Sequence, residues 1–349
     1  VDAFATLNVV DLLVDDDLTV TGDVAVTGDY SSTTSGTSNL RLGVNAGNSI
    51  ASGGNYNVVV GDEAGTALTT GDGNTAIGFE ALVTEDAHGN NTAVGYRSLK
   101  TLNAGADGFN TAVGYQSGTS MTTGIENTLI GSLAGDALTN SDFNVAVGVN
   151  ALSTDTLGSR TVAIGRETLF AQNFTTATDT YNVAVGYRAG AAVTTGLKNT
   201  LIGGLAGDSL TTNGLNVAVG YGSLSTEDTG SRNVAIGVSA LSSQNADTTN
   251  YNVAVGYNAG SAVTTGIQNT LIGGLAGDAL TDADGNVAVG RAALTTDTLG
   301  SQTVAIGSRA LNSQNFTTAT DSYNTAVGAD AGLSVTTGVE NTLIGGLAG

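Results

Sequence analysis

The residues best suited to acid–base chemistry are few, and they lie in polar turns between short apolar segments. His88, in the turn Thr-Glu-Asp-Ala-His-Gly-Asn, is the only histidine in 349 residues. A Ser-His-Asp triad would depend on this single side chain, because no similar turn elsewhere in the chain repeats it. We interpret His88 as a solvated loop residue and expect no nucleophilic catalysis.

Two carboxylate pairs, Glu85-Asp86 and Glu227-Asp228, offer the residue types that a glycan-cutting enzyme uses as general acid and base. Both pairs lie in turns beside threonine, where a solvated surface is the ordinary interpretation. The pair Gly203-Gly204 lacks the Lys and the Ser or Thr that complete a phosphate-binding loop. The sequence therefore predicts a protein that is not an enzyme and has no catalytic residues.

Metal sites have little support in the residue pattern. The absence of cysteine excludes thiolate ligands and disulfides. The turn 281–285 offers oxygen ligands through Asp282 and Asp284, but the glycine-rich calcium-binding nonapeptide is absent and the acidic positions vary between similar turns. We expect no cofactor and no bound metal, with calcium as the alternative.

The segments that must position these turns are copies of the pentapeptide Asn-Val-Ala-Val-Gly. Eighteen copies, the first of them degenerate, place their glycines from Gly43 to Gly345, and twelve of the seventeen steps are 17 residues. A fixed short period of this kind indicates a solenoid. The predicted fold is all-β: a parallel β-solenoid with about 17 residues per coil.

Within one copy, the alternation predicts a short strand with Val183 and Val185 on one face and Asn182 and Ala184 on the other. Glycine ends the strand because a solenoid corner requires positive φ or close backbone approach. A second apolar pair, such as Ala192-Val193, predicts a second short strand in each coil. We expect a core of Val, Ala and Leu.

The asparagine that opens each copy is predicted to stack on its neighbours and to form a hydrogen-bonded structural ladder along the rod. Thr161 and Thr303 replace it in two copies. The predicted ladder consists of Asn57, Asn74, Asn91, Asn110, Asn127, Asn144, Asn182, Asn199, Asn216, Asn233, Asn252, Asn269, Asn286, Asn324 and Asn341.

The chain divides into two parts. Residues 1–38 predict a β-strand neck and a Ser, Thr and Gly linker, and residues 39–349 predict a shaft of eighteen coils. At roughly 4.8 Å per coil the shaft would be about 85 Å long. From Gly114 onward four coil types recur every 70 or 72 residues, and the fourth type carries a long loop. The chain begins without methionine and stops inside a repeat, so we expect a longer polypeptide.

Composition limits the classes of partner that the protein can bind. The formal net charge of −21 argues against nucleic acid and anionic membranes, and no apolar run is long enough to span a bilayer. Proline is absent, which suits continuous strand pairing, since proline would remove a backbone donor. The regular Val and Ile positions and 40% hydrophobic content argue against disorder in this glycine-rich chain.

The motif Asn-Val-Ala-Val-Gly, followed after two residues by Ala or Ser, resembles the head repeats of trimeric autotransporter adhesins. This resemblance covers residues 39–349 and implies a left-handed β-roll assembled as a homotrimer. The adhesin repeat is a few residues shorter than 17. The Leu-Thr-Val-Thr-Gly-Asp unit at residues 18–23, combined with the long repeat array, is also similar to bacteriophage tail-fibre and other virion proteins.

From this resemblance we expect a non-enzymatic fibre shaft for adhesion, located on the virion as a tail fibre or on a cell surface. The expected partners are two further copies, a virion attachment protein upstream, and a host cell-surface glycan or protein as receptor. The alternatives are a bacterial surface adhesin and a polysaccharide depolymerase. Aromatic residues are the predicted receptor contacts, with corner packing as the alternative explanation: Tyr187, Tyr257, Phe174 and Phe316.

Overall fold

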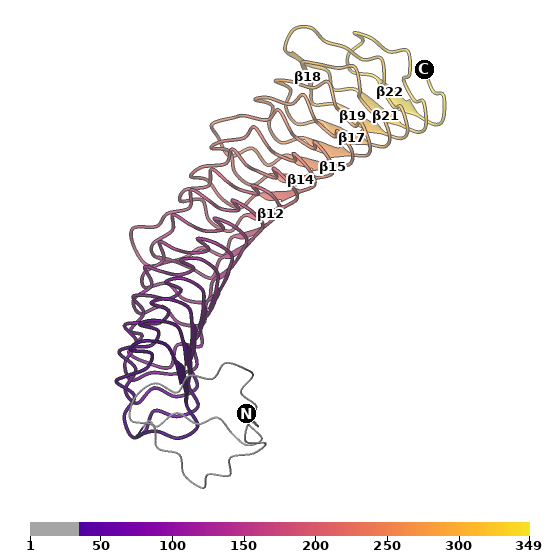
Figure 1. Cartoon of the computed structure of the whole chain (residues 1–349). Helices are drawn as coiled ribbons and strands as arrows, with labels where there is room; N and C mark the ends of the chain where they lie inside the picture. Colours follow the sequence, from indigo (N-terminus) through magenta and orange to yellow (C-terminus); the bar gives the residue numbers. More distant parts are fainter. Residues whose placement is uncertain (1–34) are drawn as a thin grey trace, which may run out of the picture.

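The computed structural model describes residues 35–349, so the predicted neck and the first half of the linker lie outside the described residues. The described chain is a parallel β-solenoid of eighteen coils that follow one another along a curved rod (Figure 1). It contains no helix long and apolar enough to cross a membrane. Most of the labelled strands run along the inner side of the arc, and β18 (Gly300–Ser301) lies on the outer side.

Each coil contributes one three-residue strand to a single 18-stranded sheet. These strands are β1 (Leu40–Leu42), β2 (Val58–Val60), β3 (Thr75–Ile77), β4 (Thr92–Val94), β5 (Thr111–Val113), β6 (Thr128–Ile130), β7 (Val145–Val147), β9 (Val162–Ile164), β11 (Val183–Val185), β12 (Thr200–Ile202), β13 (Val217–Val219), β14 (Val234–Ile236), β15 (Val253–Val255), β16 (Thr270–Ile272), β17 (Val287–Val289), β19 (Val304–Ile306), β21 (Thr325–Val327) and β22 (Thr342–Ile344).

The predicted second strand of each coil is absent from most coils. Only two long loops add further strands, which pair as β8 (Gly158–Ser159) with β10 (Thr178–Asp179) and as β18 (Gly300–Ser301) with β20 (Thr320–Asp321). The rest of each coil consists mostly of turns and bends, in which the motif glycine, the residues two and four places after it, and the residue before the ladder position adopt positive φ. A chain that reverses direction this tightly has no room for a second extended segment.

Equivalent residues of successive coils pair in register. Val183 of β11 pairs with Thr200 of β12, and Thr200 pairs with Val217 of β13. The motif glycine enforces this register at the corner. Gly203 has φ of 134°, and a Cβ added there would lie 2.5 Å from the carbonyl oxygen of Gly220. Both reasons expected for glycine, positive φ and close approach, therefore apply at this corner.

The strand valines contribute less to the core than the expected mixture of Val, Ala and Leu suggests, because most of them lie on the outer face of the sheet. Ala184 is fully buried, whereas Val183 and Val185 are only half-buried on the outer face. The core instead consists of the central strand residue, a small residue three places after the glycine, and leucines from the turns. Alternation separates two faces, and here both faces are apolar, so the pattern did not identify the inner one.

The four-coil period has a packing cause. Seven residues after each motif glycine one side chain points inward, and in two successive coils it is apolar, as at Met121 and Leu138. In the next two coils it is polar, as at Asp155 and Gln172, which are also fully buried. In those coils a buried leucine four places after the glycine, such as Leu152, supplies the apolar volume. Each block of four coils thus contains one buried polar layer.

Candidate functional site

The predicted ladder asparagines lie in one fully or largely buried column next to the sheet. The Oδ1 of Asn57 accepts from the backbone N–H of Asn74 at 2.8 Å, and its Nδ2 donates to the carbonyl of Gly71 at 2.8 Å. The same pattern recurs at Asn269 and Asn286. The ladder bonds therefore run mainly from side chain to backbone of the next coil, and they satisfy buried polar groups.

Four buried carboxylates form a second set of internal polar groups. They recur once every four coils, seven residues after the motif glycine, and all four are fully buried: Glu85, Asp155, Glu227 and Asp297. The sequence analysis interpreted Glu85 and Glu227 as solvated, and the structure shows that this interpretation was wrong. Burial raises the pKa of both glutamates, and hydrogen bonds from backbone amides partly offset the shift.

Each carboxylate anchors the long loop of the following coil. The Oδ1 of Asp155 accepts from the N–H of Gly158 and from the N–H of Phe174, both at 3.1 Å, and its Oδ2 accepts from Gln172 at 2.6 Å. Asp297 makes the equivalent three bonds. Because the bonded amides belong to two coils, the carboxylate fixes where the loop leaves the rod.

The length of the loop depends on whether the buried acid is aspartate or glutamate. Where the buried acid is Asp155 or Asp297, the following step between motif glycines is 21 residues, and where it is Glu85 or Glu227 the step is 19. The longer loops pair with the preceding coil through β8–β10 and β18–β20, whereas the loop between Gly237 and Gly256 makes only one bridge, from Thr249 to Ser231. The four-coil period thus begins before Gly114, with Glu85.

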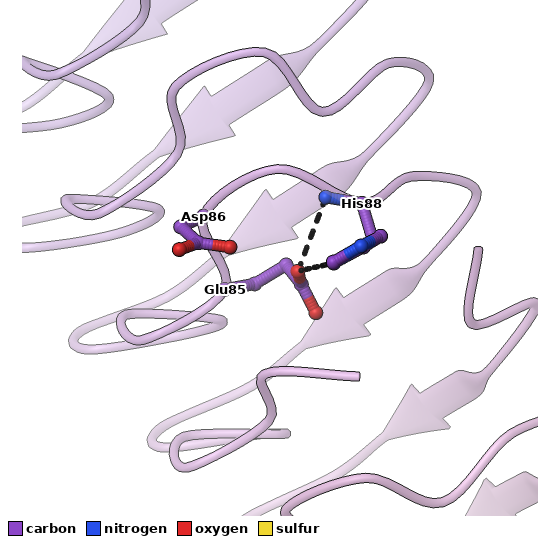
Figure 2. A group of neighbouring side chains, drawn as sticks. All are labelled: Glu85, Asp86 and His88. Atoms are coloured by element: carbon purple, nitrogen blue, oxygen red, sulfur yellow. Dashed lines mark hydrogen bonds and ion pairs between the residues drawn. The ribbon is translucent and has the colours of Figure 1, made fainter. Parts of the chain in front are cut away.

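Glu85, Asp86 and His88 form the one group of potential metal ligands within residues 35–349 (Figure 2). The Nδ1 of His88 lies 3.3 Å from the Oε1 of Glu85. The same carboxylate also accepts from the N–H of His88 at 3.3 Å and from the N–H of Ala104 at 3.1 Å. One ligand atom from each of the three residues lies within 4.8 Å of the others, but Figure 2 shows no hydrogen bond or ion pair that joins Asp86 to the other two side chains.

These contacts give Glu85 the loop-anchoring role of the other three acids. In the equivalent coils a glycine occupies the His88 position, and glutamine occupies the position of Leu102. The imidazole of His88 lies beside the buried carboxylate of Glu85, but its Nδ1 does not form the hydrogen bond that the glutamine amide donates to Asp155 and Asp297. We assign the cluster to loop anchoring, since Glu85 is committed to two backbone amides.

The turn proposed for calcium is also used internally. The Oδ1 of Asp284 accepts from the N–H of Ile267 at 2.8 Å, and the Oδ1 of Asp282 accepts from the hydroxyl of Thr265 at 2.7 Å. Both acids thus connect neighbouring coils.

The predicted receptor contacts separate into two kinds. Tyr187 and Tyr257 are 49% and 60% exposed at the corner after the strand. Phe174 and Phe316 are only 6% exposed, and their backbone N–H groups donate to the anchoring carboxylates of Asp155 and Asp297. We therefore withdraw the two phenylalanines as receptor contacts and describe them as loop anchors.

One concentration of exposed aromatic residues lies among the side chains that directly follow the motif glycine. Phe79, Tyr96 and Tyr115 occupy the same corner of three successive coils, and their rings stack at centroid distances of 5.6 and 5.3 Å. Arg97 lies 4.9 Å from the Tyr96 centroid. The signal was present in the spacing, since only here do aromatics follow three consecutive motif glycines.

No family model, curated protein or solved structure matches the chain. Its function is therefore inferred from the geometry and from the resemblance of its repeats.

Proposed function

We propose that the protein is the shaft of an attachment fibre, assembled from three parallel copies, and that it is not an enzyme. The observation that carries the proposal is a charge-free aliphatic stripe on the outer face of the sheet. The fourth motif position is Val, Ile or Leu in all eighteen coils, and the second is Val, Thr or Leu. Ile130, Ile202 and Ile272 of this stripe are each 39% exposed.

An apolar stripe that runs the length of a rod favours association along that whole length. Two further copies would cover it from both sides around a common axis. The net charge of −21 opposes random sideways association of rods, so a specific, apolar contact is the arrangement that the surface favours.

The internal acids support attachment rather than catalysis. All four buried carboxylates bind backbone amides of loops, and none of the four lines either of the two surface hollows at residues 195–215 and 140–179. Shape, stiffness and repeated outward-facing side chains are what such a rod supplies to a receptor-binding fibre.

The assembly can be tested by mass measurement in solution. The wild-type rod is expected to have the mass of a trimer at micromolar concentration, and the double variant Val185→Glu/Val219→Glu is expected to dissociate it. The control Thr195→Glu/Thr212→Glu adds the same charge on loops away from the stripe. A monomeric wild-type rod, or equal dissociation by both pairs, would contradict the trimer.

The resemblance to tail-fibre proteins makes a virion the proposed location, with a bacterial surface adhesin as the second candidate. Immunogold labelling of phage particles and of the bacterial surface distinguishes the two. Incubation with host polysaccharide tests the depolymerase alternative, and release of reducing ends would contradict the proposed absence of enzyme activity.

A further inference from the structure

A second corner of the rod, immediately before the ladder residue, carries an unusual sequence of side chains in seven successive coils. We name it the corner row, and its members are Phe143, Arg160, Tyr181, Lys198, Leu215, Arg232 and Tyr251. All seven have positive φ between 51° and 65°. The row is bounded by Glu126 in the coil before and Gln268 in the coil after.

The corner row differs chemically from the rest of this acidic rod. It contains three of the ten basic residues of the chain, on alternate coils and therefore about 10 Å apart. Arg160 lies 4.9 Å from the ring centroid of Phe143, and Arg232 lies 5.6 Å from that of Tyr251. The aromatic members are well exposed, Tyr181 at 52% and Tyr251 at 54%.

Two of the three cations have no partner among the acids of residues 35–349. Arg160 pairs with Asp179, but neither Lys198 nor Arg232 forms an ion pair. The guanidinium of Arg232 instead donates to the hydroxyl of Thr249 at 3.2 Å. Two exposed positive charges are thus available to an external anion.

The surface is hollowed at two points along the row. One hollow, of about 390 Å³, is lined by Phe143, Arg160 and the loop 177–179, with Asp142 and Asp179 as its acidic groups. The other, of about 260 Å³, is lined by Lys198, Leu215 and Thr195 among others, and no acid lines it. Both could accept a group projecting from an extended chain.

We propose that the corner row binds an acidic polysaccharide that lies along the rod. Aromatic side chains offer apolar surface to the faces of sugar rings, and the cations between them match carboxylate or sulfate groups. Cations on alternate coils suit a polymer with an acid on every second sugar. A nucleic acid carries far denser charge, which the net charge of −21 would repel.

This proposal rests on the proposed attachment function and names the receptor class. Binding of the full chain is measured on immobilised hyaluronate, which carries a carboxylate on every second sugar and no sulfate, and on chondroitin sulfate, which adds sulfate groups. The comparison shows whether carboxylate alone is recognised or sulfate is required. Neutral dextran and poly(dT) serve as the comparison ligands. We expect saturable binding to at least one of the two acidic polymers, weakened by salt, and tighter than binding to either comparison ligand.

The decisive variants are matched in charge. Arg160→Gln/Lys198→Gln/Arg232→Gln is expected to weaken binding at least tenfold. Arg166→Gln/Arg188→Gln/Arg291→Gln removes the same number of charges outside the row and is expected to change binding less than twofold. Tyr181→Ala is expected to weaken binding, whereas Tyr323→Ala, at the same corner outside the row, is not.

Equal losses in both triple variants, tighter binding to poly(dT), or no binding to either acidic polymer would overturn the proposal. A rod of trimeric mass that attaches to host cells but fails these tests would retain the fibre function and lose only its assigned receptor class. Thermal unfolding of each variant checks that the rod remains folded.

Discussion

At the scale of single residues, the ladder asparagines combine two tasks in one amide. Asn286 donates from Nδ2 to the carbonyl of Gly300 and accepts on Oδ1 from the N–H of Thr303, each at 2.9 Å. Asparagine fits because it carries a donor and an acceptor on a short side chain. Thr303, which stands in the ladder in place of asparagine, forms a hydrogen bond between its hydroxyl and that of Ser322. This bond replaces one of the two that an asparagine amide would make.

Replacing Asn286 by alanine should leave both backbone groups buried without partners. We expect a loss of about 2–4 kcal/mol of local stability, from two unsatisfied groups. Hydrogen exchange of the Thr303 amide measures the effect and should accelerate. Val287→Thr is the control, since threonine occupies that strand position in other coils. Unchanged exchange at Thr303 would show that the ladder bond is not stabilising.

Three aspartates at one turn position are less well satisfied. The Oδ1 atoms of Asp136, Asp208 and Asp278 are buried and accept no hydrogen bond in the described chain. Burial raises the pKa of all three, and that of Asp136 from 3.8 to about 6. The folded protein therefore binds this proton more tightly than the unfolded chain does.

The sign of the pH dependence follows from this shift. The free energy of unfolding should fall as the pH rises through the range from about 4 to about 6, and the penalty is complete at pH 7. Asp136→Asn should stabilise the rod at pH 7.5 by on the order of 1 kcal/mol, discounted because the side chain is partly exposed. Thermal melts of the wild type and the variant at pH 7.5 and below pH 4 test this, with Asp62→Asn as the control. The advantage should vanish below pH 4, and one that persists there would contradict the assignment.

At the scale of the coil, the loop and its buried acid behave as one element. Asp155→Ala should release the loop 173–181, because the amides of Gly158 and Phe174 and the side chain of Gln172 lose their acceptor. The bonds from Thr178 to Leu157 and from Thr180 to Ser159 should open more often. Hydrogen exchange at these two amides measures the change.

The same molecule contains its own control for this experiment. The loop 315–323 has the identical arrangement around Asp297, so the amides of Thr320 and Ser322 should keep their wild-type exchange rates. Acceleration at both loops would indicate a global loss of stability, and acceleration at neither would remove the anchoring role of Asp155.

Sequence alone predicted the coil count, the parallel stacking and the glycine corners, because these depend on strict periodicity. It did not predict the burial of Glu85 and Glu227, since a carboxylate in a polar turn is usually solvated and only its contacts with backbone amides show otherwise. It also misplaced the rings of Phe174 and Phe316. Their burial depends on how a long loop folds back, which no short-range pattern specifies.

At the scale of the whole molecule, the four-coil block is the unit that can be removed without mismatch. Deleting residues 149–220 removes 72 residues and joins two coils of the same type. Deleting residues 166–186 removes only 21 residues, but it leaves Asp155 without Gln172 and Phe174.

The larger deletion should therefore be the better tolerated. We expect the 72-residue deletion to melt within a few degrees of wild type and the 21-residue deletion to melt at a clearly lower temperature, since it leaves a buried carboxylate short of donors. Circular dichroism melts of the two deletions measure this. A lower melting temperature for the larger deletion would mean that coil number outweighs coil order.

The positive-φ corner before each ladder residue has an evolutionary consequence. Tyrosine, glycine, asparagine, phenylalanine, glutamate, arginine, lysine and leucine all occupy it in this one chain, at Tyr56, Gly73, Asn90, Phe109, Glu126, Arg160, Lys198 and Leu215, while the neighbouring column keeps asparagine almost throughout. Point mutations there can change what the molecule recognises without touching what holds it together. Unequal recombination between near-identical blocks could also multiply or delete a successful surface in one step, so that new specificities arise faster than new folds.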